Sequence, residues 1–340
     1  MTSPVLREPV GLQSAPRDLP TRLDGPRTPV AGAASLALRP LLERPRRPAR
    51  IVAVFPSAVY LEVRAASGAP AEPGVLALVS SDAVRLPNAV VVGAGSRDRP
   101  FGTVRESDDA WIGDGTVEIT VPVPGAAASA CQPRLDAVSR IRVRIRRWWD
   151  PCPVLGPVSH SRLAHGVMAL DTASSEGVFG LAGHPGPLQL AARCAAGDLA
   201  HAVDAAERIV GLGPGLTPSG DDVLAGLLVS LRLMGGAVHG GETAIWLADW
   251  IGAAVTADAR TRTTALAATL LHCAARGQVA AEVAAVLRAL AGQEPLAPAT
   301  RRLLGAGHTS GADLIWGLLA GCRTTLALSA ATAAAGRASA

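Results

Sequence analysis

The residue pattern changes character near residue 155, and this change constrains the fold more than any other feature of the chain. From residue 50 to about 150, short apolar runs are separated by clusters of Gly, Pro, Ser and Asp, which is typical of short β-strands at regular spacing. Beyond 155, Ala and Leu dominate, apolar residues recur with a helical period, and glycines mark the breaks. The sequence therefore predicts an α+β protein, in which a small β-sandwich or barrel precedes an all-helical bundle.

These patterns divide the chain into four segments. The predicted segments are a flexible Pro/Arg-rich leader (1–48), a β-rich domain (49–152), a helical domain (153–329) and a frayed tail (330–340). The predicted strands are 51–55, 58–63, 75–79, 88–92, 116–121 and 140–146. The predicted helices are 159–174, 186–196, 198–210, 220–235, 241–257, 261–276, 278–291, 296–305 and 311–328.

The last predicted strand, 140–146, alternates four arginines strictly with Ile141, Val143 and Ile145. Because successive side chains of a strand point to opposite faces, this pattern places the apolar residues on one face and the arginines on the other. Two interpretations of the arginine face remain open. It is either a solvated surface or a surface that binds an anion or a partner protein.

All 32 basic residues are arginine, because the sequence contains no lysine. A GC-rich codon bias is the simplest origin of this composition, but it has a chemical consequence. Schiff-base catalysis by lysine and a phosphate-loop lysine are both excluded. An anionic substrate must therefore meet arginine, a metal ion or a helix N-terminus. The net charge of +4 and the aromatic content of 3% do not favour nucleic-acid binding.

The sequence also bears on location. Arg7, Glu8, Arg17 and Asp18 interrupt any apolar signal core at the N-terminus. No apolar run reaches the roughly 18 residues that would span a bilayer. The five cysteines are scattered, odd in number and without a Cys-x-x-Cys pair, so we expect reduced core thiols in a cytoplasmic protein without a membrane segment. They are Cys131, Cys152, Cys194, Cys273 and Cys322.

A half-repeat lies in the helical region. The pattern Ser-Gly-x-Asp-x-x-x-Gly-Leu-Leu occurs at 219–228 and again at 310–319. In each copy the serine, Ser219 or Ser310, is a natural N-cap, and the aspartate three residues later can close a capping box. The later glycine of each copy allows another backbone to approach closely. The simplest interpretation is thus two capped helices that cross at Gly226 and Gly317.

The first copy contains more than a cap requires. Gly213, Gly215 and Gly220 free the backbone for unusual turns and leave N–H groups that can hold an anion. Asp221 and Asp222, however, would repel a bare anion at this helix start. Two explanations remain open: the carboxylates orient an amide or ureido N–H group, or they bind a divalent cation such as Mg²⁺ or Mn²⁺. Two carboxylates are too few ligands to assert a metal.

A third segment, 258–264, opens another predicted helix. Arg260 or Arg262 could offer a guanidinium to a carboxylate or phosphate, or could simply face solvent. His308 is the best-placed acid–base residue, although a histidine beside a cap can be purely structural. The predicted catalytic residues are Asp221, Asp222 and His308. The predicted substrate or anion contacts are Gly213, Gly215, Thr217, Ser219, Gly220, Arg262, Thr263, Thr309, Ser310, Gly311 and Asp313. We expect the segments 213–222, 260–264 and 307–313 to converge in space.

The glycine-rich segment 211–222 with its following Leu-Ala-Gly-Leu-Leu resembles the signature of the bacterial AllH-like family, which contains a subunit of oxamate carbamoyltransferase. The segments 262–264 and 307–311 occur in the order and spacing expected of that family. The β-rich part is similar but weaker, so the resemblance covers roughly residues 50–325.

This resemblance implies one subunit of a multi-protein enzyme of allantoin and purine catabolism. In that family, three proteins together convert oxalurate and phosphate into oxamate and carbamoyl phosphate. A small carboxylate with a ureido group, phosphate and other enzyme subunits are therefore the implied partners, with no certain cofactor. Two alternatives remain: a non-catalytic protein that binds a small anion or serves assembly, and a stand-alone metal-assisted hydrolase of a small acid.

Overall fold

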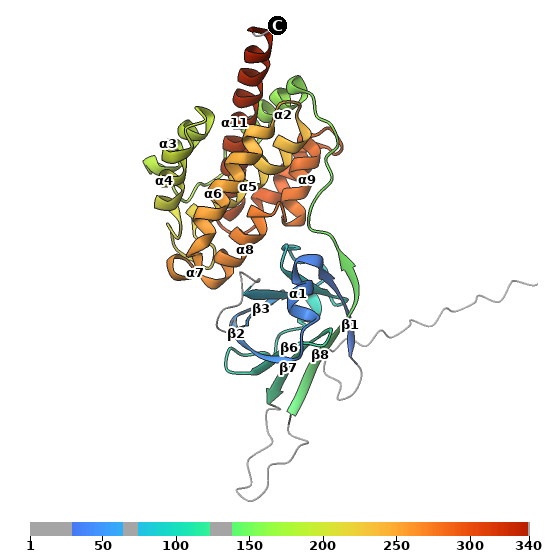
Figure 1. Ribbon diagram of the computed structural model, residues 1–340. Helices are drawn as coiled ribbons and strands as arrows, with labels where there is room; N and C mark the ends of the chain where they lie inside the picture. The colour runs from blue at the N-terminus through green and yellow to red at the C-terminus, as the bar shows by residue number, and fades with distance from the viewer. Residues whose placement is uncertain (1–28, 64–73, 123–137, 339–340) are drawn as a thin grey trace, which may run out of the picture.

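The computed structural model describes residues 29–63, 74–122 and 138–338, which form a β-barrel and a helical domain placed end to end (Figure 1). The barrel is closed, with strands in the order β1-β5-β4-β3-β2-β6-β7-β8, and β1 pairs parallel to β8 to complete it. The strands are β1 (Val30–Ser35), β2 (Arg47–Phe55), β3 (Ala58–Glu62), β4 (Val75–Val79), β5 (Ala89–Val92), β6 (Asp109–Gly113), β7 (Thr116–Pro122) and β8 (Val138–Trp149). The predicted α+β class, with a barrel before helices, is confirmed.

Alternating apolar side chains of the strands fill the barrel. Leu61, Leu78, Ile112 and Ile119 are fully buried in it, as period-2 strands with one inward face require. The short helix α1 (Arg39–Leu42) contributes two more buried leucines to the same core. Every residue of β4 is buried, because the helical domain packs against this side of the barrel.

The predicted limits of the first and last segments were wrong. The barrel begins with β1 at Val30, inside the segment predicted to be a flexible leader; residues 1–28 lie outside the described part of the chain. The strand VAGAAS has weak β propensity of its own, and its pairing with β5 and β8 decides its conformation. At the other end α11 continues to Ala338 through the predicted frayed tail, as its alanine-rich composition favours.

The helical domain contains ten described helices, and most of their ends agree closely with the predicted ranges. They are α2 (His160–Ser174), α3 (Pro185–Ala195), α4 (Leu199–Ile209), α5 (Ser219–Ala237), α6 (Glu242–Ala257), α7 (Ala259–Arg262), α8 (Ala265–Ala275), α9 (Ala281–Leu290), α10 (Leu296–Leu304) and α11 (Ser310–Ala338). The helix predicted at 261–276 is instead broken. Thr263 is extended, and the Thr264 side chain caps α8 by accepting from the Ala267 N–H at 3.0 Å.

The two copies of the half-repeat form the starts of α5 and α11, and these helices cross at the predicted glycines. A Cβ atom on Gly226 would lie 2.2 Å from the Leu314 carbonyl oxygen, and one on Gly317 would lie 2.1 Å from the Val223 carbonyl oxygen. The contact is therefore reciprocal, and only glycine permits the two backbones to approach this closely. The predicted crossing is confirmed.

Helix α11 bears on the expectation that no segment spans a membrane. Over Ser310–Ala334 it is long and apolar enough to do so by length and composition alone, although Asp313 and Arg323 interrupt its apolar residues. Within that helix, 56% of the most apolar window is buried inside the protein. A helix at the centre of a helical domain passes the same test, so this composition is weak evidence for a membrane span.

The described cysteines are free of disulfides. Cys194, Cys273 and Cys322 are buried, and burial raises the pKa of each thiol to about 12. Cys152 is half-buried, and burial raises its thiol pKa as well. Cys131 lies outside the described residues.

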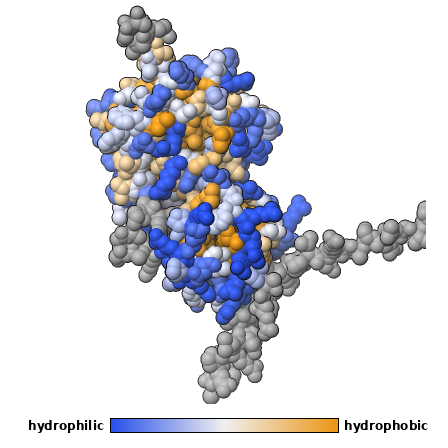
Figure 2. Space-filling model, turned by 45° about the vertical axis from the view of Figure 1, so that its right-hand side comes forward, coloured by the Kyte–Doolittle hydropathy of each residue, from blue (hydrophilic) through white to orange (hydrophobic). Residues whose placement is uncertain are grey.

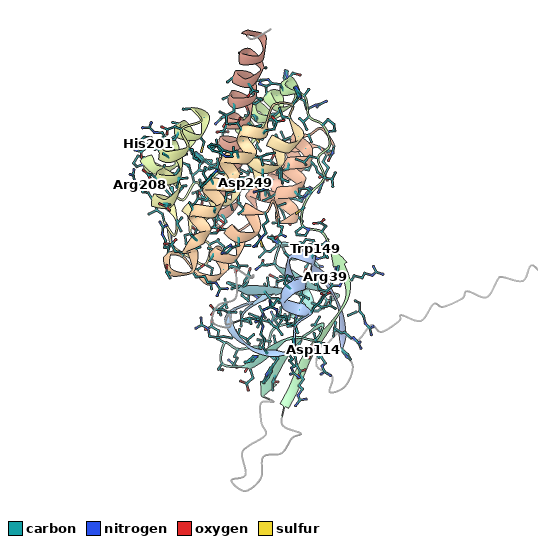
Figure 3. The ribbon with its side chains drawn as sticks, viewed as in Figure 1. Arg39, Asp114, Trp149, His201, Arg208 and Asp249 are labelled. Carbon is teal, nitrogen blue, oxygen red and sulfur yellow. The ribbon has the colours of Figure 1, made fainter. Side chains whose placement is uncertain are left out.

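The barrel is fixed to the helical domain along α8 and α9. The backbone N–H of Val75 donates to the Thr269 hydroxyl at 3.1 Å, and the Ala281 N–H donates to the Arg85 carbonyl at 3.0 Å. Trp149 lies where the two parts meet (Figure 3), with the Arg85 guanidinium over its ring. On the face drawn in Figure 2, apolar residues gather in the helical part, while hydrophilic residues cover much of the barrel.

The predicted arginine strand is β8, and its alternation is as expected, with Ile141 and Val143 buried. On its other face, Arg142 and Arg140 lie 3.1 Å and 3.9 Å from the carboxylate of Glu118, a buried residue of β7. Arg46 of β2 lies 3.1 Å from the same carboxylate. Part of the arginine face thus has an intramolecular partner. Its binding of an anion or a partner protein stays a prediction.

Candidate functional site

The three glycine- and threonine-rich segments converge at the starts of α5, α8 and α11. The Thr217 and Ser310 hydroxyls are hydrogen-bonded at 3.0 Å, which joins the first segment to the third. The Thr263 hydroxyl donates to an Asp221 carboxylate oxygen, and the Thr264 hydroxyl donates to the Leu216 carbonyl at 2.5 Å. The predicted convergence is therefore found.

Glycines are required where these segments pack. Gly211, Gly213 and Gly215 all have positive φ, and a Cβ atom on Gly211 would lie 2.2 Å from the Arg262 carbonyl oxygen. At the helix starts, a Cβ on Gly220 would lie 1.9 Å from the Ile209 carbonyl oxygen. The equivalent Gly311 would bring a Cβ to 1.9 Å from the Leu303 carbonyl oxygen. In both copies of the repeat, therefore, the C-terminal end of the preceding helix packs directly against the glycine in the first turn of the next helix.

The predicted capping by Ser219 was wrong. Pro218 is the N-cap residue of α5, Ser219 is already helical, and no side chain caps this end. The Ser219 hydroxyl lies 3.5 Å from the Thr309 hydroxyl instead. Ser310 is likewise the first residue of α11, and its hydroxyl contacts Thr217. Contacts between the two repeat copies therefore replace the local capping bonds that the motif predicted.

Asp221 joins two segments of the chain through its carboxylate, and we call it the structural latch of the site. It is 3% exposed; one carboxylate oxygen accepts from the Gly211 N–H at 2.9 Å, and the other accepts from Thr263. Burial raises the pKa of this carboxyl group, while the Thr263 and Gly211 hydrogen bonds and the Arg262 charge oppose that change. Because both oxygens are engaged, Asp221 holds the glycine-rich loop to the start of α8.

Asp222 points elsewhere and is not held in this way. It is 6% exposed, and its Oδ2 atom has no hydrogen-bond partner among the described residues. Burial is the main cause that raises its pKa to about 8, and the charges of Asp313 and Asp221 add to it. Hydrogen bonds from Ser310 and Thr217 act in the opposite direction. A buried acid with an unsatisfied oxygen is a common mark of a functional site.

Asp222 lines a pocket of about 230 Å³ between the barrel and the helical domain. Its polar lining residues are Tyr60, Thr217, Asp221, Asp222, Gln278, Glu282 and Ser310, and most of the remaining wall is apolar. Glu282, like Asp222, has one buried carboxylate oxygen without a hydrogen-bond partner among the described residues. Burial also raises the pKa of the Tyr60 phenol, which reaches the pocket from β3. The apolar wall comes from the barrel and from several helices. Its members are Val84, Leu86 and Pro87 of the barrel; Ala225 and Val229 of α5; Leu266, Ala267, Leu270 and Ala274 of α8; Val279, Ala280 and Val283 at the start of α9; and Leu303, Ala306 and Leu314 of α10, α11 and the segment between them.

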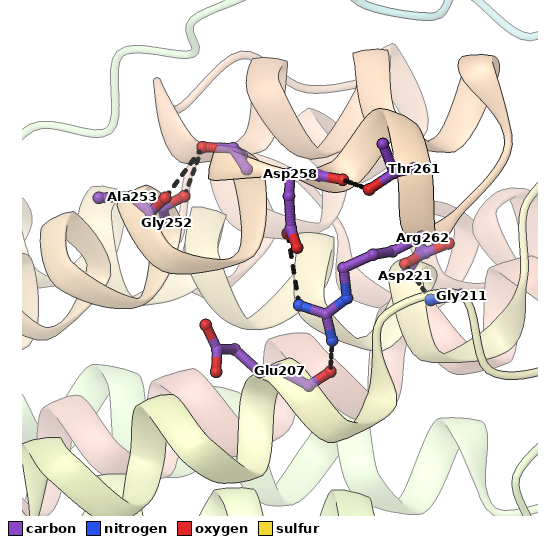
Figure 4. Close-up of polar contacts among 9 residues, drawn as sticks. Glu207, Gly211, Asp221, Gly252, Ala253, Asp258, Thr261 and Arg262 are labelled. Carbon is purple, nitrogen blue, oxygen red and sulfur yellow. Dashed lines mark hydrogen bonds and ion pairs between the residues drawn. The ribbon is translucent and has the colours of Figure 1, made fainter.

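Arg262 does not line this pocket. Its guanidinium donates to the Glu207 carbonyl at the end of α4 and lies 3.4 Å from the Asp258 carboxylate (Figure 4). The Arg260 guanidinium lies against Gly74 of the barrel. Neither arginine predicted to bind an anion therefore faces Asp222.

The other predicted residues divide into two groups. Four of them line the pocket: Thr217, Asp221, Asp222 and Ser310. His308 is exposed and does not line it, and Asp313 lines a different pocket. The remaining predicted residues do not line the pocket either, namely Gly213, Gly215, Ser219, Gly220, Thr263, Thr309 and Gly311. Tyr60 and the apolar wall were missed, because apolar residues on separate elements carry no motif.

The side chains do not fit a metal site. Across residues 29–63, 74–122 and 138–338, no three His, Cys, Asp or Glu side chains are grouped to hold an ion. Asp221 already uses both oxygens on protein donors. A Mg²⁺ or Mn²⁺ ion needs more oxygen ligands than the remaining acids of the pocket, Asp222 and Glu282, provide.

Fold and pocket together define a two-part α+β protein, in which an acidic pocket lies between a closed barrel and a helical domain built on a half-repeat. The family model of the oxamate carbamoyltransferase subunit AllH matches residues 209–322. This stretch contains both glycine-rich helix starts, so the resemblance to the AllH-like family is confirmed there. No solved structure matches the chain.

Proposed function

We propose that this protein is a cytoplasmic subunit of an oxamate carbamoyltransferase-like enzyme, and that its pocket receives the ureido group of oxalurate. The observation that carries the proposal is Asp222, a buried acid with one unpartnered oxygen in a pocket whose wall is mainly apolar. The family match supports the subunit assignment, since the AllH model is described as a subunit of that enzyme.

The protonation of Asp222 suits a ureido group. With its pKa raised to about 8, Asp222 is mostly protonated at pH 7. A neutral carboxyl group both donates and accepts a hydrogen bond, and a ureido group offers a carbonyl and an N–H in matching positions. An ionised Asp222 in the same place would repel an anionic substrate.

The other half of the repeat contains an internal analogue of this contact. Asp313 occupies the position equivalent to Asp222, and its Oδ1 atom accepts the peptide N–H of Gly180 at 3.0 Å. A Cβ atom on Gly180 would lie 2.0 Å from the Ser219 hydroxyl, so the peptide fits tightly there. One repeat aspartate thus already binds an amide N–H, which supports the same role for Asp222.

The proposed reaction requires a proton at the position of Asp222. An oxygen of phosphate forms a bond to the ureido carbonyl carbon, and the bond between that carbon and the nitrogen of oxamate breaks. The departing nitrogen takes up a proton, which the neutral Asp222 carboxyl group is placed to supply. The products are then oxamate and carbamoyl phosphate, and the proton that hydrogen phosphate loses replaces the one that Asp222 has given up.

A phosphate site is the part that this pocket lacks. No arginine lines it among the described residues, and its wall is mainly apolar. Phosphate is normally held by arginine, a metal or exposed backbone N–H groups. We therefore infer that another subunit completes the site, which agrees with the multi-protein assembly that the family description implies.

Ligand-induced stabilisation tests the proposal. Purified protein would be heated with oxalurate, oxamate, carbamoyl phosphate, phosphate, Mg²⁺ or Mn²⁺. A ligand at about 100 times its Kd adds roughly 2.7 kcal/mol, which corresponds to a melting shift of roughly 5 °C for a chain of this size. We expect a shift with oxalurate that Asp222→Ala abolishes and that Asp249→Ala, at an exposed residue of α6, preserves.

Other outcomes separate the alternatives. A shift that persists in Asp222→Ala would contradict the pocket assignment. Stabilisation by phosphate or another anion alone, without oxalurate, would instead favour a non-catalytic anion-binding protein. Stabilisation only by Mg²⁺ or Mn²⁺ would favour the metal-assisted hydrolase.

A further inference from the structure

A second pocket, of about 190 Å³, lies on the other side of the two repeat helices. Asp313, Val223 and Trp316 form its helical wall. The opposite wall is the chain that leads into α3 together with the first turn of that helix, and it consists of Phe179, Leu181, Ala182, Gly183, His184, Pro187 and Leu188. Neither the family match nor the proposed function assigns a role to this pocket.

The two pockets are related by the half-repeat. Asp222 and Leu314 line the first pocket, whereas their equivalents Asp313 and Val223 line the second. Each pocket thus takes its acid from one repeat helix and an apolar side chain from the other. The crossing of α5 and α11 therefore generates two acidic pockets in one chain.

One carboxylate oxygen of Asp313 is available for a further hydrogen bond. The residue is 1% exposed, and its Oδ1 atom accepts from the Gly180 N–H. Its Oδ2 atom has no hydrogen-bond partner among the described residues. Leaving a buried carboxyl oxygen unsatisfied is unfavourable, and a ligand that donates a hydrogen bond would remove that cost.

His184 supplies the complementary group. Its Nδ1 atom accepts from the Gly186 N–H at 3.1 Å and thereby caps α3. In the neutral ring the proton must then be on Nε2, which makes that atom a donor. Trp316 and Leu188, the latter 68% exposed, add apolar surface beside these two polar groups.

We propose that this second pocket binds a small primary carboxamide. Its NH₂ group donates to Asp313 Oδ2, its carbonyl accepts from His184 Nε2, and its apolar face lies against Trp316. The proposal is independent of the ureido site at Asp222, because the two pockets share no lining residue.

Tryptophan fluorescence provides the test, because Trp316 lines the second pocket and no tryptophan lines the first. The full chain would be titrated with acetamide into the molar range, because a probe with four heavy atoms binds weakly. We expect a saturable change that disappears in Trp316→Phe and whose Kd rises about tenfold or more in Asp313→Asn. Asp222→Asn should leave the titration unchanged.

A second variant keeps the test decisive if Asp313→Asn does not fold. Asparagine is a good N-cap residue, so His184→Asn should retain the cap of α3 while losing the longer reach of the imidazole. We expect normal melting behaviour and at least a fivefold weaker response to acetamide. No saturable change in the wild type, or equal affinity in wild type and both variants, would overturn the proposal. The oxalurate melting assay reports on Asp222 separately, so failure of one site is distinguishable from failure of the other.

Discussion

Alanine at Gly226 should destabilise this protein, although alanine is normally the better residue in a helix. The new Cβ would lie 2.2 Å from the Leu314 carbonyl oxygen, 3.0 Å from the Leu318 nitrogen and 3.1 Å from the Gly317 Cα. All three are backbone atoms, so no side-chain rotation relieves the clash and the two helices must move apart. Overpacking of this kind destabilises a protein by about 3 kcal/mol when the clashing atoms cannot rotate away. The higher helix propensity of alanine offsets only about 1 kcal/mol of this, so the free energy of unfolding should fall by about 2 kcal/mol.

Gly236, near the end of the same helix, is the matched control. A Cβ there would meet nothing within 4 Å, so Gly236→Ala should stabilise the protein by about 0.5–1 kcal/mol. Urea unfolding of both variants measures the difference between a helix glycine at a contact and one in open space. If Gly226→Ala proved as stable as Gly236→Ala, the close crossing of α5 and α11 would be refuted.

The double variant Gly226→Ala with Gly317→Ala gives a sharper test. The two positions touch, since each hypothetical Cβ lies within about 3 Å of the other glycine's Cα. Once the helices have separated for one alanine, the second finds part of its space already open. We therefore expect the double variant to lose less stability than the sum of the single losses. Strict additivity would show that the two clashes are relieved independently.

Three further predictions concern buried acids. The Asp222 carboxyl group loses its proton near pH 4 in the unfolded chain, but its pKa is raised to about 8 in the folded protein. Between these two pH values, its contribution makes the free energy of unfolding fall by about 1.4 kcal/mol per pH unit. Urea midpoints from pH 5 to 9 should therefore fall less steeply in Asp222→Asn, and identical pH slopes would contradict the raised pKa. Thr263→Val should cost about 1–3 kcal/mol by removing a donor to Asp221, whereas Thr261→Val at an exposed hydroxyl should be nearly neutral; equal effects in thermal unfolding would argue against the latch. Glu118→Gln should cost about 2 kcal/mol, because it leaves three half-exposed arginines without their shared buried carboxylate, and a change under 0.5 kcal/mol in denaturant unfolding would mean that the cluster contributes little.

The helices could be predicted closely because their signals are local. The Ala- and Leu-rich periods and the glycines between them placed most ends within a few residues of those found. β1 and β6 were missed, since neither has a long β-branched run and both depend on pairing with distant strands. The break between α7 and α8 was also missed, because threonine is tolerated inside a helix and only the contacts of Thr263 and Thr264 favour the turn.

The candidate site could be located from the sequence, but the roles within it could not be assigned. Asp221 and Asp222 are adjacent, and their side chains point about 100° apart around the helix, one toward Thr263 and the other into the pocket. Which aspartate is a latch and which remains unsatisfied depends on residues far away in the chain. The motif likewise suggested that Arg262 binds an anion, whereas its guanidinium is engaged at the end of α4.

The barrel supplies Tyr60 and Leu86 to a pocket whose acid belongs to the helical domain. A molecule that fills this pocket contacts both parts, so its binding and the contact between the barrel and the helical domain are thermodynamically linked. A partner protein that stabilises the contact of the barrel with α8 and α9 would raise the affinity for the ligand, and the ligand would raise the affinity for that partner by the same factor. In an assembly of several proteins, this reciprocity would let substrate binding at one subunit change how tightly its neighbours bind, without any new contact between their active centres.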